Sequence, residues 1–112
     1  MPLIFGFADQ RRRLLEEEFL RISSELGPLG AERFYLAGDL ARDAVRAASD
    51  LEVVVVQETV EPPARRADFF TTHLRPSVGV RFHVFTPAEF DSSAGTHPLL
   101  RETLALSPSI SA

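Results

Sequence analysis

The stretch "LAGDLARDAVRAASDLEVVVV", residues 36–56, decides the predicted fold. It contains a glycine, Gly38, ahead of a helix-like segment, and it ends in a run of four valines. Unbroken valines indicate a strand that is buried on both faces, so we expect residues 51–57 to lie in the centre of a sheet. Asp50 and Glu52 stand at the start of that strand. The stretch therefore predicts a central strand that carries two carboxylates where it begins.

Asp50 and Glu52 have a spacing that suits a metal ion. Residues two apart on a strand point to the same side. Two such carboxylates can share Mg²⁺, which prefers oxygen ligands in a near-octahedral shell and often binds substrate phosphates as well. A glycine at a strand-to-helix turn lets a phosphate approach the backbone, and the following helix N-terminus supplies free N–H groups. A two-metal site would need a third carboxylate from a neighbouring strand.

Helical and strand patterns alternate along the rest of the chain. Apolar residues at helical spacing predict a first helix over residues 9–26, with Asp9 as its N-cap. The other expected elements are strands at residues 33–37 and 78–85, helices at 39–48, 67–74 and 97–106, and a short helix that begins at Thr86. The polar tail, residues 107–112, is expected to be frayed. This order predicts an α/β (α+β) fold with a small mixed sheet flanked by helices.

The composition is that of an ordinary globular protein. A length of 112 residues predicts a single domain over residues 1–112, with a core over about residues 10–106. The chain has no run of 18 apolar residues, which argues against a membrane span. We expect no signal peptide, because no positive region precedes the short apolar stretch near the start, and we expect a cytoplasmic location.

Charge and residue usage exclude several kinds of chemistry. The absence of cysteine excludes disulfides, thiolate metal ligands and cysteine nucleophiles. All 12 basic residues are arginine, so no lysine can act as a base, nucleophile or phosphate ligand. A net charge of −4 argues against strong nucleic-acid binding. The run of arginines at residues 11–13, followed by glutamates at 16–18, is interpreted as a solvated helix face.

The segment "GDLARDAVRAASDLEV", residues 38–53, resembles the minimal nucleotidyltransferase family of the DNA polymerase β-like superfamily. That family's motif reads G-S-x-A-R-G, five residues, S-D-x-D, and then a hydrophobic strand. Two later segments, "VRFHVFTPAEF" and "HPLLRETL", are similar to the family's third-carboxylate strand and closing helix. The likeness covers about residues 10–106. The motif positions that match without a gap are Gly38, Ala41, Arg42, Ser49 and Asp50.

The resemblance implies a function as well as a fold. Members transfer a nucleoside monophosphate from an NTP, here expected to be ATP, to an acceptor with the help of Mg²⁺. The family pattern implies that Asp50 and Glu52 are the catalytic, metal-binding carboxylates. The residues that it implies for nucleotide binding are Gly38, Asp39, Arg42 and Ser49. Many small members act with a helical partner of the HEPN type, some as antitoxins, so such a partner is expected here; a homodimer is the other association we consider.

Within this segment the sequence departs from the motif at three positions, of which Asp43 is the least informative. Asp39 replaces the motif serine, and a carboxylate at ~4 Å from a phosphate costs about 1 kcal/mol in water and more in a protein. Our interpretation of Asp39 is that it serves as the N-cap of the following helix. Asp43 replaces the second glycine, and Asp tolerates a left-handed conformation better than most residues. Glu52 replaces the second Asp, and its longer side chain alters the geometry offered to Mg²⁺.

A fourth departure concerns the third carboxylate. Counting back from "TPAEF" puts its position at Arg81, and a shift of two residues would make it His83 on the same face. Neither residue is a carboxylate. Arg81 beside Asp50 and Glu52 would form a charge-assisted pair in the space that a metal ion needs.

Three hypotheses remain open from the sequence. The first is an active nucleotidyltransferase with a reduced metal site made of Asp50 and Glu52 alone. The second is a non-catalytic binding or scaffold subunit of the same fold, a pseudoenzyme in which Arg81 pairs with Asp50 or Glu52. The third is a generic small α/β domain whose motif match arose by chance.

Overall fold

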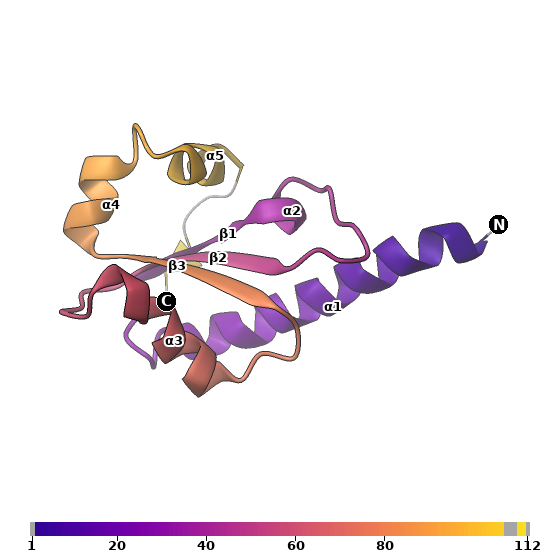
Figure 1. The fold of residues 1–112 in the computed structure, drawn as a ribbon, viewed down its shortest axis with the longest axis horizontal. Coiled ribbons are helices and arrows are strands. Elements are labelled where there is room, and N and C mark those ends of the chain that lie inside the picture. The colour runs from indigo at the N-terminus through magenta and orange to yellow at the C-terminus, as the bar shows by residue number, and fades with distance from the viewer. Residues whose placement is uncertain (1, 107–109, 112) are drawn as a thin grey trace.

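The computed structural model describes residues 2–106 and 110–111. Helices and strands alternate along this part of the chain, except that two helices follow the third strand in succession (Figure 1). In order they are α1 (Pro2–Leu26), β1 (Arg33–Ala37), α2 (Gly38–Ala41), β2 (Leu51–Val56), α3 (Pro63–Leu74), β3 (Val80–Phe85), α4 (Pro87–Ser93), α5 (Pro98–Leu106) and β4 (Ile110–Ser111). The predicted α/β fold with a small mixed sheet is confirmed.

The strands form one sheet in the order β3-β2-β1-β4. β2 pairs with β1 in the antiparallel sense and with β3 in the parallel sense, so the sheet is mixed. The predicted central position of the valine strand is confirmed. All four valines of β2, residues 53–56, have no exposed surface, because the strand has a neighbour on each edge and helices on each face.

The two faces of the sheet are covered by different helices (Figure 1). α1 and α3 pack on one face, and α4 and α5 pack on the other. The first face buries Leu15, Ile22, Leu26, Phe34, Val53, Val55, Phe70, Leu74 and Phe82, among others. The second face buries Tyr35, Ala37, Val54, Val56, Phe90 and Leu100. Alternate valines of β2 therefore belong to different clusters, as the two-residue period of a strand requires.

Three helix boundaries differ from those predicted. α1 begins at Pro2, so Asp9 lies inside the helix and the N-cap prediction is wrong. α2 ends at Ala41 instead of residue 48, because Asp43 takes a left-handed conformation with φ 58° that an α-helix cannot contain. α3 begins at Pro63 instead of residue 67. Proline fits the first turn of a helix because the missing N–H would have had no partner there.

The C-terminal part of the chain agrees with prediction in one respect and differs in another. Thr86 and Glu89 form the expected capping box at the start of α4. The tail was expected to be frayed, but Ile110–Ser111 pairs with β1 as a short antiparallel strand. Residues 107–109 and 112 of that tail lie outside the described part. None of the helices that the structure describes combines the length and apolar character of a membrane span.

Candidate functional site

The predicted site residues meet at the end of the sheet where β1 finishes and where β2 and β3 begin. In the strand register, Glu52 of β2 lies beside Ala37 of β1 on one edge and beside Arg81 of β3 on the other. A polar cavity of about 250 Å³ opens here. Its lining residues are Asp39, Arg42, Arg46, Ala48, Ser49, Asp50, Glu52 and Arg81.

Two glycines allow the carboxylates to lie close to the backbone. Gly38 has a positive φ of 73°, and a Cβ atom there would lie 2.5 Å from Oε2 of Glu52. A Cβ atom on Gly79 would lie 2.5 Å from Oδ1 of Asp50. The glycine at the strand-to-helix turn predicts that a phosphate approaches the backbone beside Gly38. In the structure, the side chain of Glu52 lies there instead.

Asp39 does not cap α2, so our interpretation of this residue is wrong. The N-cap position is Ala37, and Asp39 lies inside the helix. Its carboxylate accepts hydrogen bonds from the Ser49 hydroxyl at 2.6 Å and from Nη2 of Arg42 at 2.6 Å. The Ser49 hydrogen bond, followed by that from Arg42, holds the pKa of Asp39 below its usual value. Asp39 is therefore a charged carboxylate that bridges α2 to the segment before β2.

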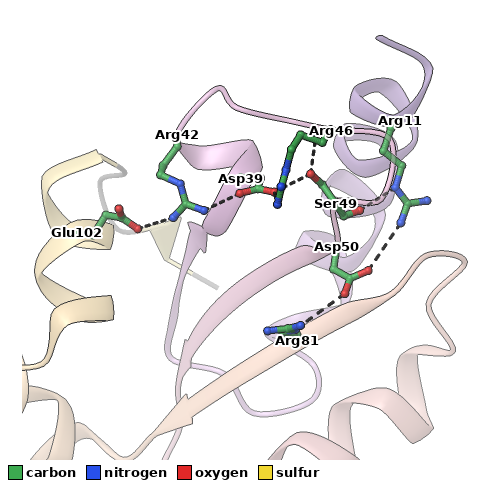
Figure 2. Close-up of polar contacts among 8 residues, drawn as sticks. All are labelled: Arg11, Asp39, Arg42, Arg46, Ser49, Asp50, Arg81 and Glu102. Carbon is green, nitrogen blue, oxygen red and sulfur yellow. Dashed lines mark hydrogen bonds and ion pairs between the residues drawn. The ribbon is translucent and has the colours of Figure 1, made fainter. Parts of the chain in front are cut away.

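The other residues expected to bind nucleotide are also held by neighbours (Figure 2). Arg42 donates from Nη1 to Oε1 of Glu102 at 2.8 Å, as well as to Asp39. The Ser49 hydroxyl accepts from the backbone N–H of Arg46 at 2.8 Å. These contacts hold Asp39, Arg42 and Ser49 together, and they use the polar groups that a phosphate would need.

Asp50 and Glu52 reach the same cavity but have different partners. Oδ2 of Asp50 lies 3.9 Å from Nε of Arg81, which is the ion pair that the non-catalytic hypothesis expects. Oε1 of Glu52 lies 3.0 Å from Nε2 of His83. Arg81 and His83 are two residues apart on β3 and therefore share a face. Both residues considered for the third-carboxylate position thus contact the two carboxylates of the motif.

Arg11 is a site residue that the sequence argument missed. The arginine run on α1 was interpreted as a solvated face, which is wrong for this residue. Nε of Arg11 donates to the backbone carbonyl of Ser49 at 2.7 Å, and its Nη2 lies 3.8 Å from Oδ1 of Asp50 (Figure 2). Arg11 reaches Ser49 and Asp50 because of the way α1 packs on the sheet, and no local sequence pattern encodes that packing.

Comparisons with known proteins show the fold. No family model matches the chain, and no curated protein matches it. The structure is similar to the crystal structure of a "putative nucleotidyltransferase" from Sulfolobus solfataricus, with a TM-score of 0.50 and 19% identity over 79% of this chain and 78% of that chain. The chain has the nucleotidyltransferase fold. At this level of identity the likeness concerns the fold alone, so the chemistry must be argued from the residues.

The residues of this nucleotidyltransferase fold do not fit the metal centre that the family resemblance implies. No group of three or more His, Cys, Asp or Glu side chains that could hold a metal ion exists within residues 2–106 and 110–111. Arg81 stands beside Glu52 where a third carboxylate is needed. Its guanidinium brings a positive charge where Mg²⁺ would require a negative ligand. Asp50 and Glu52 alone do not supply the three carboxylates that the resemblance implies.

Proposed function

We propose that this protein is a nucleotidyltransferase-fold protein that has lost Mg²⁺-dependent nucleotidyl transfer and acts as a non-catalytic binding subunit. The observation that carries the proposal is the position of Arg81, in register with Glu52 and 3.9 Å from Asp50. Two unit charges at ~4 Å interact by about 4 kcal/mol at an effective dielectric of 20, and a divalent ion would feel about twice that repulsion from the guanidinium. Metal binding between these carboxylates is therefore disfavoured.

Asp39 supports the same proposal from the other side of the cavity. It stands where the family motif has the serine that holds the triphosphate, and its lowered pKa keeps it charged at neutral pH. A carboxylate there repels a phosphate and cannot donate a hydrogen bond to it. Arg42 and Ser49, which would offset that charge for a ligand, already hydrogen-bond to Asp39.

Incubation of the purified protein with labelled ATP and either Mg²⁺ or Mn²⁺ tests the loss of transfer. We expect no label on the protein or on an added partner. The matched control is Asp50→Asn, which keeps the side-chain shape and removes a metal ligand. Metal-dependent labelling by the wild type that disappears in the control would overturn the proposal. Arg81→Asp supplies the converse test, because a third carboxylate beside Glu52 should tighten Mn²⁺ binding in a calorimetric titration.

The second candidate is a weakened transferase that uses Asp50 and Glu52 alone, with ATP as nucleotide. The observation that favours it is that both carboxylates line one cavity with Ser49 and Arg42. This candidate predicts slow transfer that Glu52→Gln abolishes. A rate equal in the wild type and in both carboxylate variants would exclude it.

The partner remains part of the proposal. The family resemblance favours a small helical protein of the HEPN type in a toxin–antitoxin pair located in the cytoplasm. Co-expression with the product of an adjacent gene for such a protein, followed by affinity purification of the complex, tests this assignment. A homodimer is the alternative, and sedimentation of the isolated protein at several concentrations distinguishes the two.

A further inference from the structure

An apolar groove of about 420 Å³ lies along α1, where this helix borders β1 and α2. Its lining residues are Arg12, Glu16, Phe19, Leu20, Leu36 and Leu40. Among the described residues it shares no lining residue with the cavity of Asp50 and Arg81. Leu20 is 71% exposed and adjoins the other apolar side chains of the groove. Contiguous apolar surface of this kind marks a place where another molecule binds.

The α1 side of the groove follows one row of residues at a spacing of four. The row is Ala8, Arg12, Glu16 and Leu20. Residues four apart on a helix lie on the same face. In chain order the row reads small, positive, negative and large. Two copies of the row that run antiparallel about residue 14 would set Arg12 opposite Glu16 and Ala8 opposite Leu20. The row is therefore complementary to itself.

Arg12 and Glu16 are both able to reach a second molecule. Nη2 of Arg12 lies 2.6 Å from Oδ1 of Asp43, and the Arg12 side chain is 33% exposed. A guanidinium group has five N–H donors, so this pair leaves donors for a second carboxylate. Glu16 is exposed. The two residues are separated by about 6 Å along the helix axis. Two reciprocal contacts would thus flank a two-fold axis without bringing like charges together.

We infer that a second copy of this chain occupies the groove, with the two α1 helices antiparallel across a two-fold axis at residue 14. Arg12 of each copy pairs with Glu16 of the other, and Leu20 of each copy packs against Ala8 of the other. Such an interface uses the same surface of both molecules. Interdigitation of rows at a spacing of four is the commonest way in which helices pack.

The first turns of α1 fit the same arrangement. They extend past the end of the sheet (Figure 1). Their sequence, "PLIFGFA", residues 2–8, contains no charged residue. In an antiparallel pair centred on residue 14, residues 2–8 of one helix lie beside residues 20–26 of the other. The pairing therefore brings an uncharged helical segment to the exposed Leu20.

The inference concerns the association that is the alternative to a helical partner in the proposed function. The family resemblance favours a different protein as partner, whereas the self-complementary charges of the groove favour a second copy. The loss of nucleotidyl transfer does not enter this argument, because the groove and the site cavity have separate lining residues.

Sedimentation equilibrium of the full chain over a series of concentrations tests the inference. The wild type should form a dimer. Arg12→Glu and Glu16→Arg should each weaken the dimer at least about tenfold, because like charges then face each other across the axis. An equimolar mixture of the two variants should regain the dimer, because both charge contacts of the mixed pair then join opposite charges.

Arg13→Glu and Glu17→Arg are the matched controls for the charge reversals. They make the same changes at exposed positions of α1 that do not line the groove. Neither control should weaken the dimer, and mixing them should change nothing.

Leu20→Ser tests the apolar part of the contact. It should weaken the dimer at least about tenfold, since each dimer loses two buried leucines. Leu14→Ser is its control, because Leu14 is 45% exposed and lies outside the groove. Circular dichroism should show that Leu20→Ser keeps its fold.

Four results would overturn the inference. The first is a wild type that stays monomeric at every concentration. The second is a dimer that both charge reversals leave intact, since it would use another surface. The third is a mixture of the two charge variants that fails to associate. The fourth is a chain that is monomeric alone and binds a different protein through Leu20.

These results are separate from the test of the proposed function. Labelling with ATP reports on nucleotidyl transfer, and sedimentation reports on the groove. A monomer that transfers no label would overturn the inference and support the proposed function. A dimer that shows Mg²⁺-dependent labelling would do the reverse.

Discussion

The polar networks in the body of the protein differ from the one at the cavity. Glu18 of α1 is 5% exposed and accepts hydrogen bonds from Nε and Nη2 of Arg21, both at 2.8 Å, and from the backbone N–H of Ser77 at 2.7 Å. Arg21 also donates to the Leu74 carbonyl at 2.9 Å. This network ties α1 to the segment between α3 and β3.

Arg66 forms a second network of the same kind. Its side chain is 8% exposed, and it donates to both carboxylate oxygens of Glu89 and to the carbonyls of Glu61 and Val84. In contrast, Arg46 and Arg81 make single, long contacts and remain exposed. The difference separates charged groups that stabilise the fold from exposed charged groups that contribute little to its stability.

Removing Arg66 should have the largest effect on stability. Arg66→Ala leaves Glu89 without its bidentate partner and two carbonyls without donors, which should lower the free energy of unfolding by about 3 kcal/mol. Urea denaturation followed by circular dichroism measures the change. The control is Arg65→Ala, an exposed neighbour in the same helix, which should change stability by less than about 0.5 kcal/mol. Equal effects of the two substitutions would break the distinction between the networks.

Glu18 should make the protein less stable as the pH falls into the acid range. Hydrogen bonds from Arg21, the largest cause, and from Ser77 lower the pKa of Glu18 from 4.5 to about 2. A depressed pKa in the folded state means that the stabilisation is present above about pH 4.5 and is lost as the pH falls towards 2. The free energy of unfolding should fall by about 2–3 kcal/mol over this range. Solvent screening of the partly exposed Arg21 keeps the loss below the value that the full pKa shift would give.

Urea midpoints between pH 6 and pH 2 test the acid dependence. Glu18→Gln should be less stable than the wild type at pH 6, and the two proteins should converge near pH 2. Parallel curves across this range would show that Glu18 contributes no pH-dependent stabilisation.

Asp39 is intermediate between the buried networks of Glu18 and Arg66 and the exposed ion pairs of Arg46 and Arg81. Its substitution should therefore have an intermediate effect on stability. It is mostly buried, but it faces the cavity, and its lowered pKa comes from Ser49 and Arg42. Asp39→Asn should cost about 1–2 kcal/mol, the range for weakening charge-assisted hydrogen bonds. Urea denaturation of Asp39→Asn beside the wild type measures this change. A loss as large as that of Arg66→Ala would place Asp39 with the structural networks.

Arg81 should show the smallest effect on stability. Its pair with Asp50 is long and exposed, and such pairs contribute between 0 and about 1 kcal/mol. The free energy of unfolding of Arg81→Ala should therefore lie within about 0.5 kcal/mol of that of the wild type. Thermal denaturation of the two proteins measures the difference. A large loss of stability would place Arg81 with the structural networks instead.

Sequence patterns predicted the elements whose signals are local. The valine run gave β2 a central place, and Thr86 with Glu89 marked the start of α4. The pattern over residues 39–48 predicted too long a helix. Val45 is buried as an amphipathic helix would require, but it reaches the core from a loop. A burial pattern alone cannot distinguish these cases when one residue adopts a left-handed conformation.

The candidate site was predictable only in part, because some of its contacts come from packing between elements that are distant in the sequence. The motif spacing brought Asp50 and Glu52 together, and the downstream "TPAEF" segment located Arg81 beside them. Arg11 and Glu18 were assigned to a solvated face, whereas the packing of α1 brings one to Ser49 and buries the other. Contacts of this kind depend on where a helix crosses the sheet, which the sequence of the helix does not encode.

The left-handed conformation of Asp43 has a consequence for how this site could be rebuilt. The motif that the chain resembles has glycine at this position, and Asp43 already adopts, with φ 58°, a backbone shape that glycine favours. Its side chain is exposed, so nothing in the core depends on it. An engineer who combined Asp39→Ser, Asp43→Gly and Arg81→Asp would be changing side chains on an existing backbone. The proposed difference between this cavity and a metal-binding one therefore lies in side chains and does not require a new backbone conformation at residue 43.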